Sequence, residues 1–317
     1  MFAKRHILVR GAGGHFYGRL LPILRKYSNI CAIDVLDREF RVDRKRSFVL
    51  RESRGDSLED KTGSSLKFGL VASAPIAHLN DLCGLFDVGC SNVYVEKPVF
   101  STKGEVDWFE QANAAHRRGI NDCDMYARTK AFLYFRDWIT EKWDRSVFGS
   151  MDVKFVIPRL KRSSYRDPAD YFASEVVDVG FYPIDLMVRV ALATGIKLDL
   201  LNVQKIGLVW FCQLRGVATD DSCLNFNVEF GFGDTYVNAV SINLSGMTSI
   251  MVDKIFSARA GIKEVILDGN SFFMEDVDGL DLVLCDFLSA KSQRWNSVGD
   301  RLRSTADLLE KIWAYKD

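Results

Sequence analysis

Apolar and polar positions alternate in a regular way over the first 122 residues. Short apolar runs cover residues 6–10, 30–34, 68–72 and 92–95. Helix-like patterns separate these runs, at residues 15–27, 76–87 and 101–118. Apolar strands that alternate with helices predict a parallel sheet covered on both faces.

The pattern changes after residue 122. Helical periodicity recurs at residues 130–143, 175–193 and 299–315. Strand-like runs fill the rest, at residues 151–157, 202–213, 223–232, 235–244, 250–257 and 262–268. Gly233-Asp234 is typical of the turn of a hairpin. Consecutive strands predict a mostly antiparallel sheet, so we expect two domains with different sheets.

Composition narrows the class of protein. The chain has 317 residues, 48% of them hydrophobic, and its 42 basic side chains balance 42 acidic ones. Zero net charge argues against nucleic-acid binding, and no apolar run is long enough to span a membrane. Seven cysteines without a C-x-x-C pair argue against a disulfide framework or a zinc site. We expect a reduced, cytoplasmic protein without a metal site.

A glycine turn follows the first apolar run. Gly11 permits a tight turn, and Gly13 lets a pyrophosphate approach the backbone at the start of the next helix. Gly14 is the next candidate for phosphate binding. The third glycine of the dinucleotide fingerprint is replaced by Phe16. A side chain of this size is expected to hinder the close packing of the helix on its strand.

Asp34 ends the second apolar run, 21 residues after Gly13. An acid at this place binds the hydroxyls of the adenosine ribose and repels a 2′-phosphate, so NAD is favoured over NADP. Basic residues nearby leave NADP open, because one of them could hold the phosphate, although a solvated helix interleaved with acids is the favoured explanation. The basic residues are Arg38, Arg41, Arg44, Lys45, Arg46, Arg51 and Arg54.

Glu96-Lys97-Pro98 ends the fourth apolar run. Ligands of open α/β sheets bind at the carboxyl ends of strands, so Lys97 is predicted to face the ligand crevice, where it could bind a substrate oxygen or donate a proton. A surface lysine at a strand end is the alternative. Ser73, His78 and Glu96 join Lys97 in the predicted cofactor site, with His78 expected to start a helix or pack a turn rather than act as a catalyst.

A third motif places Asp178, Tyr182 and Asp185 four and three residues apart. On a continuous helix the three side chains share one face. A tyrosine hydroxyl can relay a proton to a carbonyl oxygen, helped by a lysine whose charge favours the phenolate. The alternative is an ordinary amphipathic helix with solvent-facing acids.

In this order the three motifs resemble the Gfo/Idh/MocA oxidoreductases, the family of glucose–fructose oxidoreductase and inositol dehydrogenase. The resemblance extends over nearly the whole chain. It implies an α/β protein with an N-terminal Rossmann domain and a C-terminal α+β domain that has an open, mostly antiparallel sheet. It places the dinucleotide-binding domain at residues 1–122 and the substrate and oligomerisation domain at 123–298. The helix at 299–317 is expected to pack back toward the first domain.

The resemblance also implies roles for single residues. Lys97 is expected to contact substrate and nicotinamide, and Asp178 and Tyr182 to line the substrate site. Many relatives carry histidine at the position of Tyr182, and others carry tyrosine, so a Lys–Tyr proton relay is indicated. Glu175 replaces a glycine-rich run and is expected to enter the substrate region. Arg128 lies about where relatives place an arginine that contacts substrate or supports the interface.

Asp185 completes the predicted substrate site, and Lys97, Tyr182 and Asp178 are the predicted catalytic residues. The sequence thus predicts an NAD(P)-dependent oxidoreductase that acts on a hydroxyl or carbonyl carbon of a sugar-like, nucleotide-linked or free, substrate. An imine-reducing biosynthetic enzyme and a non-catalytic, cofactor-binding regulator are the alternatives. Large apolar groups at alternating positions of 223–232 and 235–244 suggest a free sheet face that forms a homo-oligomer, a dimer or tetramer.

Overall fold

The computed structural model describes residues 5–11, 13, 15–36, 50–52, 66–143, 148–158, 170–219, 222–244, 248–289 and 295–315. The chain forms two compact units. The first comprises residues 1–100, 104–123 and 281–298, and the second comprises 101–103, 124–280 and 299–317. Residues 281–298 thus join the first unit and the final helix joins the second, which differs from the division suggested by the sequence.

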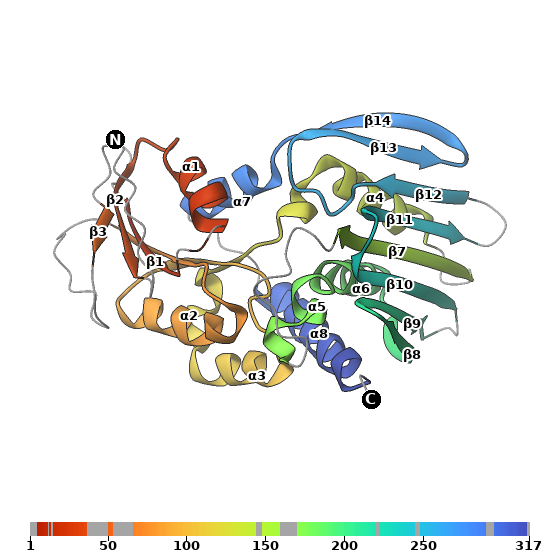
Figure 1. The fold of residues 1–317 in the computed structure, drawn as a ribbon, viewed down its shortest axis with the longest axis horizontal. Helices are drawn as coiled ribbons and strands as arrows, with labels where there is room; N and C mark the ends of the chain where they lie inside the picture. The colour runs from red at the N-terminus through yellow and green to blue at the C-terminus, as the bar shows by residue number, and fades with distance from the viewer. Residues whose placement is uncertain are drawn as a thin grey trace. The chain divides into compact units, whose positions relative to one another are not determined.

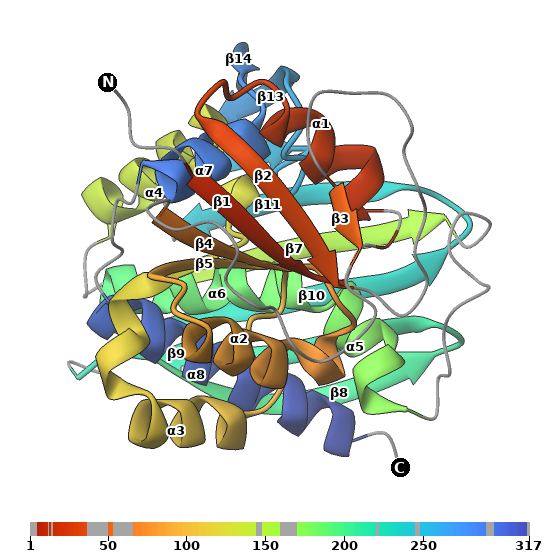
Figure 2. The same ribbon diagram turned by 90° about the vertical axis from the view of Figure 1, so that its left-hand side faces the viewer.

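The first unit contains a six-stranded parallel sheet (Figures 1 and 2). Its strands are β1 (Arg5–Arg10), β2 (Ile30–Leu36), β3 (Leu50–Glu52), β4 (Leu66–Val71), β5 (Asn92–Val95) and β6 (Ile120–Asp122). Their order, β3-β2-β1-β4-β5-β6, is that of a Rossmann sheet, whose ligand crevice opens where the order reverses, between β1 and β4. The predicted parallel sheet is confirmed.

Helices cover both faces of this sheet (Figures 1 and 2). Phe68 of β4 packs edge-on against Phe287, with ring centroids 5.4 Å apart, and its neighbour Gly69 faces Leu85 on the other side. Because the central strands β1 and β4 are buried on both faces, their middle positions, Ile7 to Val9 and Phe68 to Val71, carry no polar side chain. The helices are η1 (Phe16–Leu20, a π-helix), α1 (Leu21–Leu24), η2 (Pro75–Ala77), α2 (His78–Asp87), α3 (Lys103–Ala112), η3 (Ala114–Gly119) and α7 (Gly279–Leu288).

The second unit contains an eight-stranded sheet in the order β14-β13-β12-β11-β7-β10-β9-β8. Its strands are β7 (Gly149–Pro158), β8 (Lys197–Ile206), β9 (Val209–Val217), β10 (Cys223–Gly233), β11 (Val237–Leu244), β12 (Thr248–Asp253), β13 (Gly261–Leu267) and β14 (Asn270–Asp276). Strands β7 and β10 are parallel, and the other neighbouring pairs are antiparallel, as predicted.

The predicted hairpin at Gly233-Asp234 is wrong. Strand β7 lies between β10 and β11, and Phe155 of β7 pairs with Phe230 on one side and with Asn238 on the other. The chain therefore crosses over the end of β7. The run at 202–213 is also two strands, because Gly207, with φ of 63°, turns the chain between β8 and β9.

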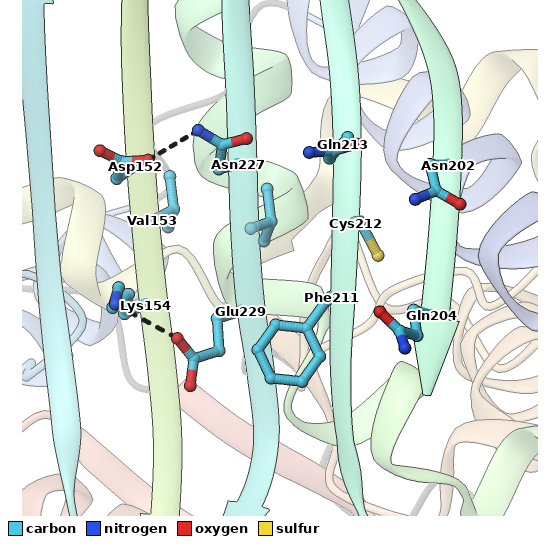
Figure 3. A pocket seen from close by; sticks show the side chains of 11 residues that line it. Asp152, Val153, Lys154, Asn202, Gln204, Phe211, Cys212, Gln213, Asn227 and Glu229 are labelled. Atoms are coloured by element: carbon cyan, nitrogen blue, oxygen red, sulfur yellow. Dashed lines mark hydrogen bonds and ion pairs between the residues drawn. The ribbon is translucent and has the colours of Figure 1, made fainter. Parts of the chain in front are cut away.

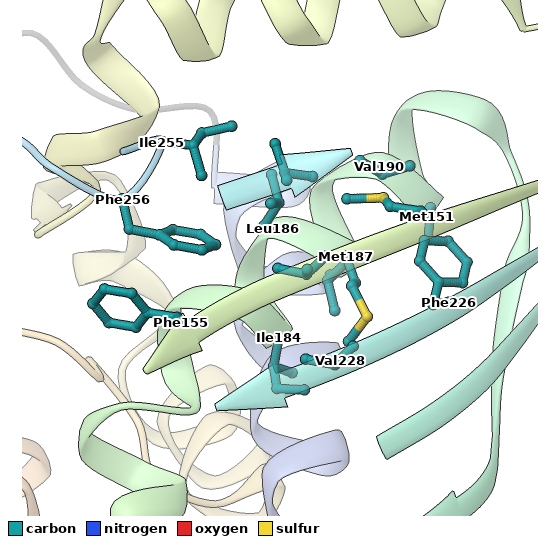
Figure 4. Packing of buried hydrophobic residues seen from close by; sticks show 14 of the residues in the cluster. Met151, Phe155, Ile184, Leu186, Met187, Val190, Phe226, Val228, Ile255 and Phe256 are labelled. Carbon is teal, nitrogen blue, oxygen red and sulfur yellow. The ribbon is translucent and has the colours of Figure 1, made fainter. Parts of the chain in front are cut away.

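The core of the second unit lies between this sheet and the helices α4 (Lys130–Lys142), α6 (Phe181–Thr194) and α8 (Trp295–Ala314). Ile184 and Met187 of α6 pack toward Val228 of β10 (Figure 4). Leu309 of α8 is fully buried in the same cluster. Among the described helices, none has the length and apolarity needed to cross a membrane.

Along β7 and β10 the opposite face of this sheet is polar. Along β10 the buried side chains Phe226 and Val228 belong to the core, whereas Asn225 and Asn227 point outward and are exposed. The apolar side chains that suggested an exposed hydrophobic face in the sequence thus face the helices. This corrects the argument for an oligomer drawn from 223–232 and 235–244, whose large apolar side chains face the core. On β13 and β14, however, Ile262 and Phe273 point outward and are exposed.

Candidate cofactor and substrate sites

The glycine turn lies at the carboxyl end of β1, beside the turn that follows β4. Gly11 has φ of 78°, and a Cβ added to it would lie 2.5 Å from the backbone nitrogen of Ser73. Only glycine fits there. Around Gly13, which is exposed, an added Cβ would meet no described atom within 4 Å. This open space suits the approach of a pyrophosphate. Gly14 lies outside the described residues.

Phe16 does not fill that space. Its side chain is fully buried in the first unit, and its ring packs edge-on against Tyr17 with centroids 5.3 Å apart. The residue begins the π-helix η1, which continues directly into α1. The aromatic replacement of the third glycine is therefore accommodated in the core, and the residues around Gly11 and Gly13 fit a bound dinucleotide.

Asp34 has a partner within the protein. It lies opposite Leu8, two residues before the ends of β1 and β2, and its Oδ2 atom is 2.8 Å from Nε2 of His6. A ribose ligand should stand at the carboxyl end of the strand, so this position and the contact with His6 do not support the assignment of Asp34 to the ribose. The preference for NAD over NADP loses its basis. The basic residues between 38 and 54 lie outside the described residues, apart from Arg51, whose backbone pairs in β3.

Glu96, the first residue after β5, is surrounded by several hydrogen-bond donors. Its Oε1 atom accepts a 2.8 Å hydrogen bond from the hydroxyl of Tyr94 and lies 3.0 Å from Nε2 of His15. Burial alone would raise the pKa of Glu96, but the hydrogen bond and charge of His15, with hydrogen bonds from Tyr94 and Cys123, outweigh it and lower the pKa to about 2. Glu96 is thus an ionised anchor next to Lys97 in the chain.

Lys97 is half-buried, and the peptide bond to Pro98 is cis. His78 begins α2, as predicted, and is 1% exposed. Its Nδ1 atom lies 2.7 Å from the carbonyl oxygen of Pro98, and Nε2 lies 2.9 Å from that of Ser73. His78 therefore joins the turns after β4 and β5, and its burial contradicts direct contact with a cofactor.

In the second unit, Tyr182 lies among aromatic rings. The ring centroids of Phe155, Tyr126 and Phe256 are 5.3, 6.1 and 6.2 Å from that of Tyr182. These three rings belong to buried residues, whereas Tyr182 is half-buried. The cage fixes the ring while leaving part of the residue accessible, which suits a hydroxyl that exchanges a proton.

The helix that carries Tyr182 is interrupted. Asp178 ends α5 (Glu175–Asp178), and α6, whose second residue is Tyr182, begins after a turn in which the amide of Gly180 bonds to the carbonyl of Glu175. A Cβ on Gly180 would lie 2.6 Å from the ring of Phe230, so glycine is needed for this close approach. Asp178 is half-buried, and the prediction of one continuous helix from 175 to 193 is wrong.

Asp185 is completely buried, which contradicts its predicted role in binding substrate. Its Oδ2 atom accepts hydrogen bonds from the hydroxyl of Tyr126 at 2.6 Å and from Nε of Arg189 at 2.7 Å, and Oδ1 accepts one from Nη1 of Arg301 at 2.8 Å. Burial would raise the pKa of Asp185, but the charges of Arg189 and Arg301 and the bond from Tyr126 lower it. Asp185 holds helices together.

Arg128 belongs to the same network. Its Nε atom donates to Oδ1 of Asp124 at 3.2 Å, and Oδ2 of Asp124 lies 3.8 Å from Nη2 of Arg189. A row of alternating charges thus runs from Arg128 to Asp185. Of the two roles left open for Arg128, this contact favours structural support.

Glu175 turns into the protein. It is 4% exposed, and its Oε2 atom lies 3.7 Å from Nζ of Lys205, which stands 4.8 Å from the ring centroid of Trp210. This burial beside β8 and β9 contradicts the prediction that Glu175 enters the substrate region.

A shallow pocket of about 270 Å³ lies on the polar face of the second sheet (Figure 3). Two pairs cross its floor, Asp152 with Asn227 at 2.8 Å and Lys154 with Glu229 at 3.4 Å. Tyr182 packs on Phe155, which faces the helices, so this pocket and Tyr182 are on opposite faces of the sheet. None of the predicted site residues lines it.

The sequence missed three residues of these networks, His15, Tyr126 and Arg301. His15 stands in the glycine turn, and its position there was the available signal. Arg301 lies 116 residues from its partner Asp185, and the sequence carries no signal for such a pairing.

Comparisons with known proteins place the fold. No family model matches the sequence, and no curated protein matches it. Among solved structures, KijD10, a 3-ketoreductase from Actinomadura kijaniata in complex with NADP and TDP-benzene, is similar with a TM-score of 0.75 and 16% identity, over 98% of this chain and 97% of that chain.

Two further structures are similar over their whole length. UDP-N-acetylglucosamine 3-dehydrogenase GnnA from Acidithiobacillus ferrooxidans has a TM-score of 0.67 and 13% identity, over 99% of this chain and 98% of that one. Aldose-aldose oxidoreductase from Caulobacter crescentus has a TM-score of 0.69 and 12% identity, over 98% and 97%. At such low identities the similarity establishes a shared two-domain fold.

Proposed function

We propose that this chain is an NAD(P)-dependent oxidoreductase of the Gfo/Idh/MocA type. It would transfer a hydride between the nicotinamide and a hydroxyl or carbonyl carbon of a sugar-like substrate. The observation that carries the proposal is the arrangement of residues at the carboxyl edge of the first sheet. There Gly11 abuts Ser73 at the reversal of strand order, and Lys97 follows β5 on the same edge.

The residues of this edge fit a dinucleotide. Space is open in front of Gly13, and His78 and Glu96 brace the turns on which a ligand would rest. When bound, the nicotinamide ring accepts or supplies the hydride. The protein's part is to hold the ligand on this edge and to supply Lys97 for the oxygen of the reacting carbon.

Tyr182 is our candidate for the residue that exchanges a proton with the substrate. Its cage of Phe155, Tyr126 and Phe256 restrains the ring, and a restrained hydroxyl is the arrangement that general acid–base catalysis requires. We propose that Lys97 and Tyr182 handle the proton of the substrate hydroxyl and that Asp178 orients the substrate.

Similar proteins support a nucleotide-linked sugar as substrate. KijD10 is a 3-ketoreductase solved with TDP-benzene, and GnnA is a UDP-N-acetylglucosamine 3-dehydrogenase. The basic segment 158–172 agrees with a phosphate on the substrate, although residues 159–169 lie outside the described part of the chain. Both NAD and NADP fit the proposal, since Asp34 is engaged by His6 and KijD10 was solved with NADP.

A homo-oligomer, a dimer or tetramer, is also proposed. The surface that supports it is the outer face of the second sheet at β13 and β14, where Ile262 and Phe273 are exposed. Light scattering at working concentration tests this proposal, and a clean monomer contradicts it.

Titration with NADH and NADPH tests the central proposal. Quenching of the six tryptophans reports binding, and oxidation or reduction of the dinucleotide at 340 nm reports turnover. We expect micromolar binding of at least one dinucleotide and turnover with nucleotide-linked sugars. Binding without turnover would favour a regulator that keeps the cofactor site, and absence of binding would remove the proposal.

A further inference from the structure

Three turns meet at the carboxyl edge of the first sheet, after β1, β4 and β5. Because β4 lies between β1 and β5, the turns after β1 and β5 are two strand spacings apart, about 10 Å. Two histidines connect these turns. His78 joins the turns after β4 and β5 from inside the protein, whereas His15 reaches from the glycine turn to Glu96.

His15 differs from His78 in its exposure. The side chain of His15 is 42% exposed, while that of its partner Glu96 is 12% exposed. His15 therefore crosses the end of β4 on the accessible side of the edge. A dinucleotide that rests on Gly13 and extends to Lys97 must pass the same place.

The contact with Glu96 determines which ring nitrogen of His15 can bind a ligand. Nε2 lies 3.0 Å from a carboxylate oxygen of Glu96, so Nε2 carries a hydrogen and donates it. Nδ1 then accepts a hydrogen bond when the ring is neutral and donates one when the ring is charged. A ribose hydroxyl both donates and accepts, so it matches Nδ1 in either state. A buried carboxylate that orients an imidazole in this way makes a pre-organised binding group.

From this geometry we propose that His15, oriented by Glu96, binds the ribose on the nicotinamide side of the dinucleotide. The proposal rests on the proposed function and adds a residue to its cofactor site. His15 touches the ligand, and Glu96 acts through His15 as a positioning residue.

The test compares three ligands, NADH, ADP-ribose and 5′-AMP, on wild type and His15→Phe. Phenylalanine keeps a ring and removes both nitrogens. NADH and ADP-ribose contain the ribose in question, and 5′-AMP lacks it. We expect His15→Phe to weaken NADH and ADP-ribose about tenfold, the effect of one lost hydrogen bond, and to leave 5′-AMP unchanged.

A matched control is His116→Phe. His116 is a half-buried histidine of the same unit whose ring stacks on Phe86, with centroids 4.6 Å apart. This variant should bind all three ligands like wild type. Glu96→Gln should weaken the binding of NADH as well. The loss of NADH binding free energy in the double variant His15→Phe/Glu96→Gln should be smaller than the sum of the losses in the two single variants, because the two residues act as one unit.

Two results would overturn the inference while leaving the proposed function intact. One is NADH affinity within twofold of wild type in His15→Phe. The other is an equal loss for 5′-AMP, which would mean that the whole turn is disturbed. If folded wild type binds neither NADH nor NADPH, the proposed function fails together with the inference.

Discussion

The hydroxyl of Tyr126 donates a 2.6 Å hydrogen bond to the carboxylate of Asp185, 59 residues further along the chain. The same Tyr126 packs its ring edge-on against Tyr182, the proposed proton donor. Arg189 donates to the same carboxylate oxygen, and Arg301 donates to the other. The network therefore ties the helix that bears Tyr182 to α8 and to the segment before α4, and it keeps the aromatic cage in place.

Replacing Asp185 with asparagine should be strongly destabilising. The change leaves two arginines without their buried counter-charge, which costs about 3 kcal/mol of unfolding free energy. Urea denaturation followed by tryptophan fluorescence measures it. Asp307→Asn on α8 is the control: it removes a partly exposed pair with Lys311, 2.7 Å apart, and should change stability by less than about 1 kcal/mol. Equal effects of the two variants would refute the role given to Asp185.

Glu96 should make stability depend on acid pH. Its pKa in the folded protein is about 2, below the ordinary value of 4.5, so the ionised carboxylate stabilises the fold above pH 4.5. This stability is lost as the pH falls from about 4.5 to about 2. Glu96→Gln should therefore be less stable than wild type at neutral pH, by on the order of 3 kcal/mol, and the difference should shrink on acidification. Urea denaturation at several pH values measures it, and a difference independent of pH would speak against the anchor.

Gly13 and Gly18 provide a matched pair of glycines. A Cβ at either position meets no described atom within 4 Å, so alanine should leave the thermal midpoint nearly unchanged or slightly raised. Gly13→Ala should still lose at least tenfold in dinucleotide affinity, because the methyl group occupies the space for the pyrophosphate. Gly18→Ala should bind like wild type. Tryptophan quenching measures both, and full affinity of Gly13→Ala would argue against a phosphate site at this turn.

Asp34→Asn should affect stability more than cofactor choice. The variant weakens a largely buried contact with His6, at a cost of about 1–3 kcal/mol. Affinities for NADH and NADPH should both stay within about twofold of wild type at a temperature where the variant is folded. A selective loss of NADH would restore the ribose role that the sequence suggested.

Much of this fold could be predicted from the sequence. The alternation of apolar runs and helices marked the parallel sheet, and the positions of Gly11 and Lys97 after strands placed both on its carboxyl edge. These features depend on local pattern. The insertion of β7 between β10 and β11 depends on pairing across about 80 residues, for which turn signals such as Gly233-Asp234 give no evidence.

The inward acids were misassigned for a related reason. Asp34, Glu175 and Asp185 were predicted to face a ligand, but each faces a basic partner from another element. Periodicity indicates which residues share a face and not what lies opposite. Arg301, the partner of Asp185, comes from a helix at the other end of the chain, so only the tertiary structure reveals the pair.

Turnover of the dinucleotide is the most direct test of hydride transfer. Wild type, Lys97→Met and Tyr182→Phe are incubated with NAD or NADP in both redox states and with hexoses, cyclitols and nucleotide-linked hexoses, and absorbance is followed at 340 nm. Tyr134→Phe is the control, since its ring packs on Phe272 away from the proposed site. The account predicts turnover by wild type and Tyr134→Phe, and a loss of about 10²-fold or more in kcat for Lys97→Met and Tyr182→Phe with dinucleotide affinity retained. Unchanged kcat in both variants, or tight binding without turnover of any substrate in either direction, would contradict it.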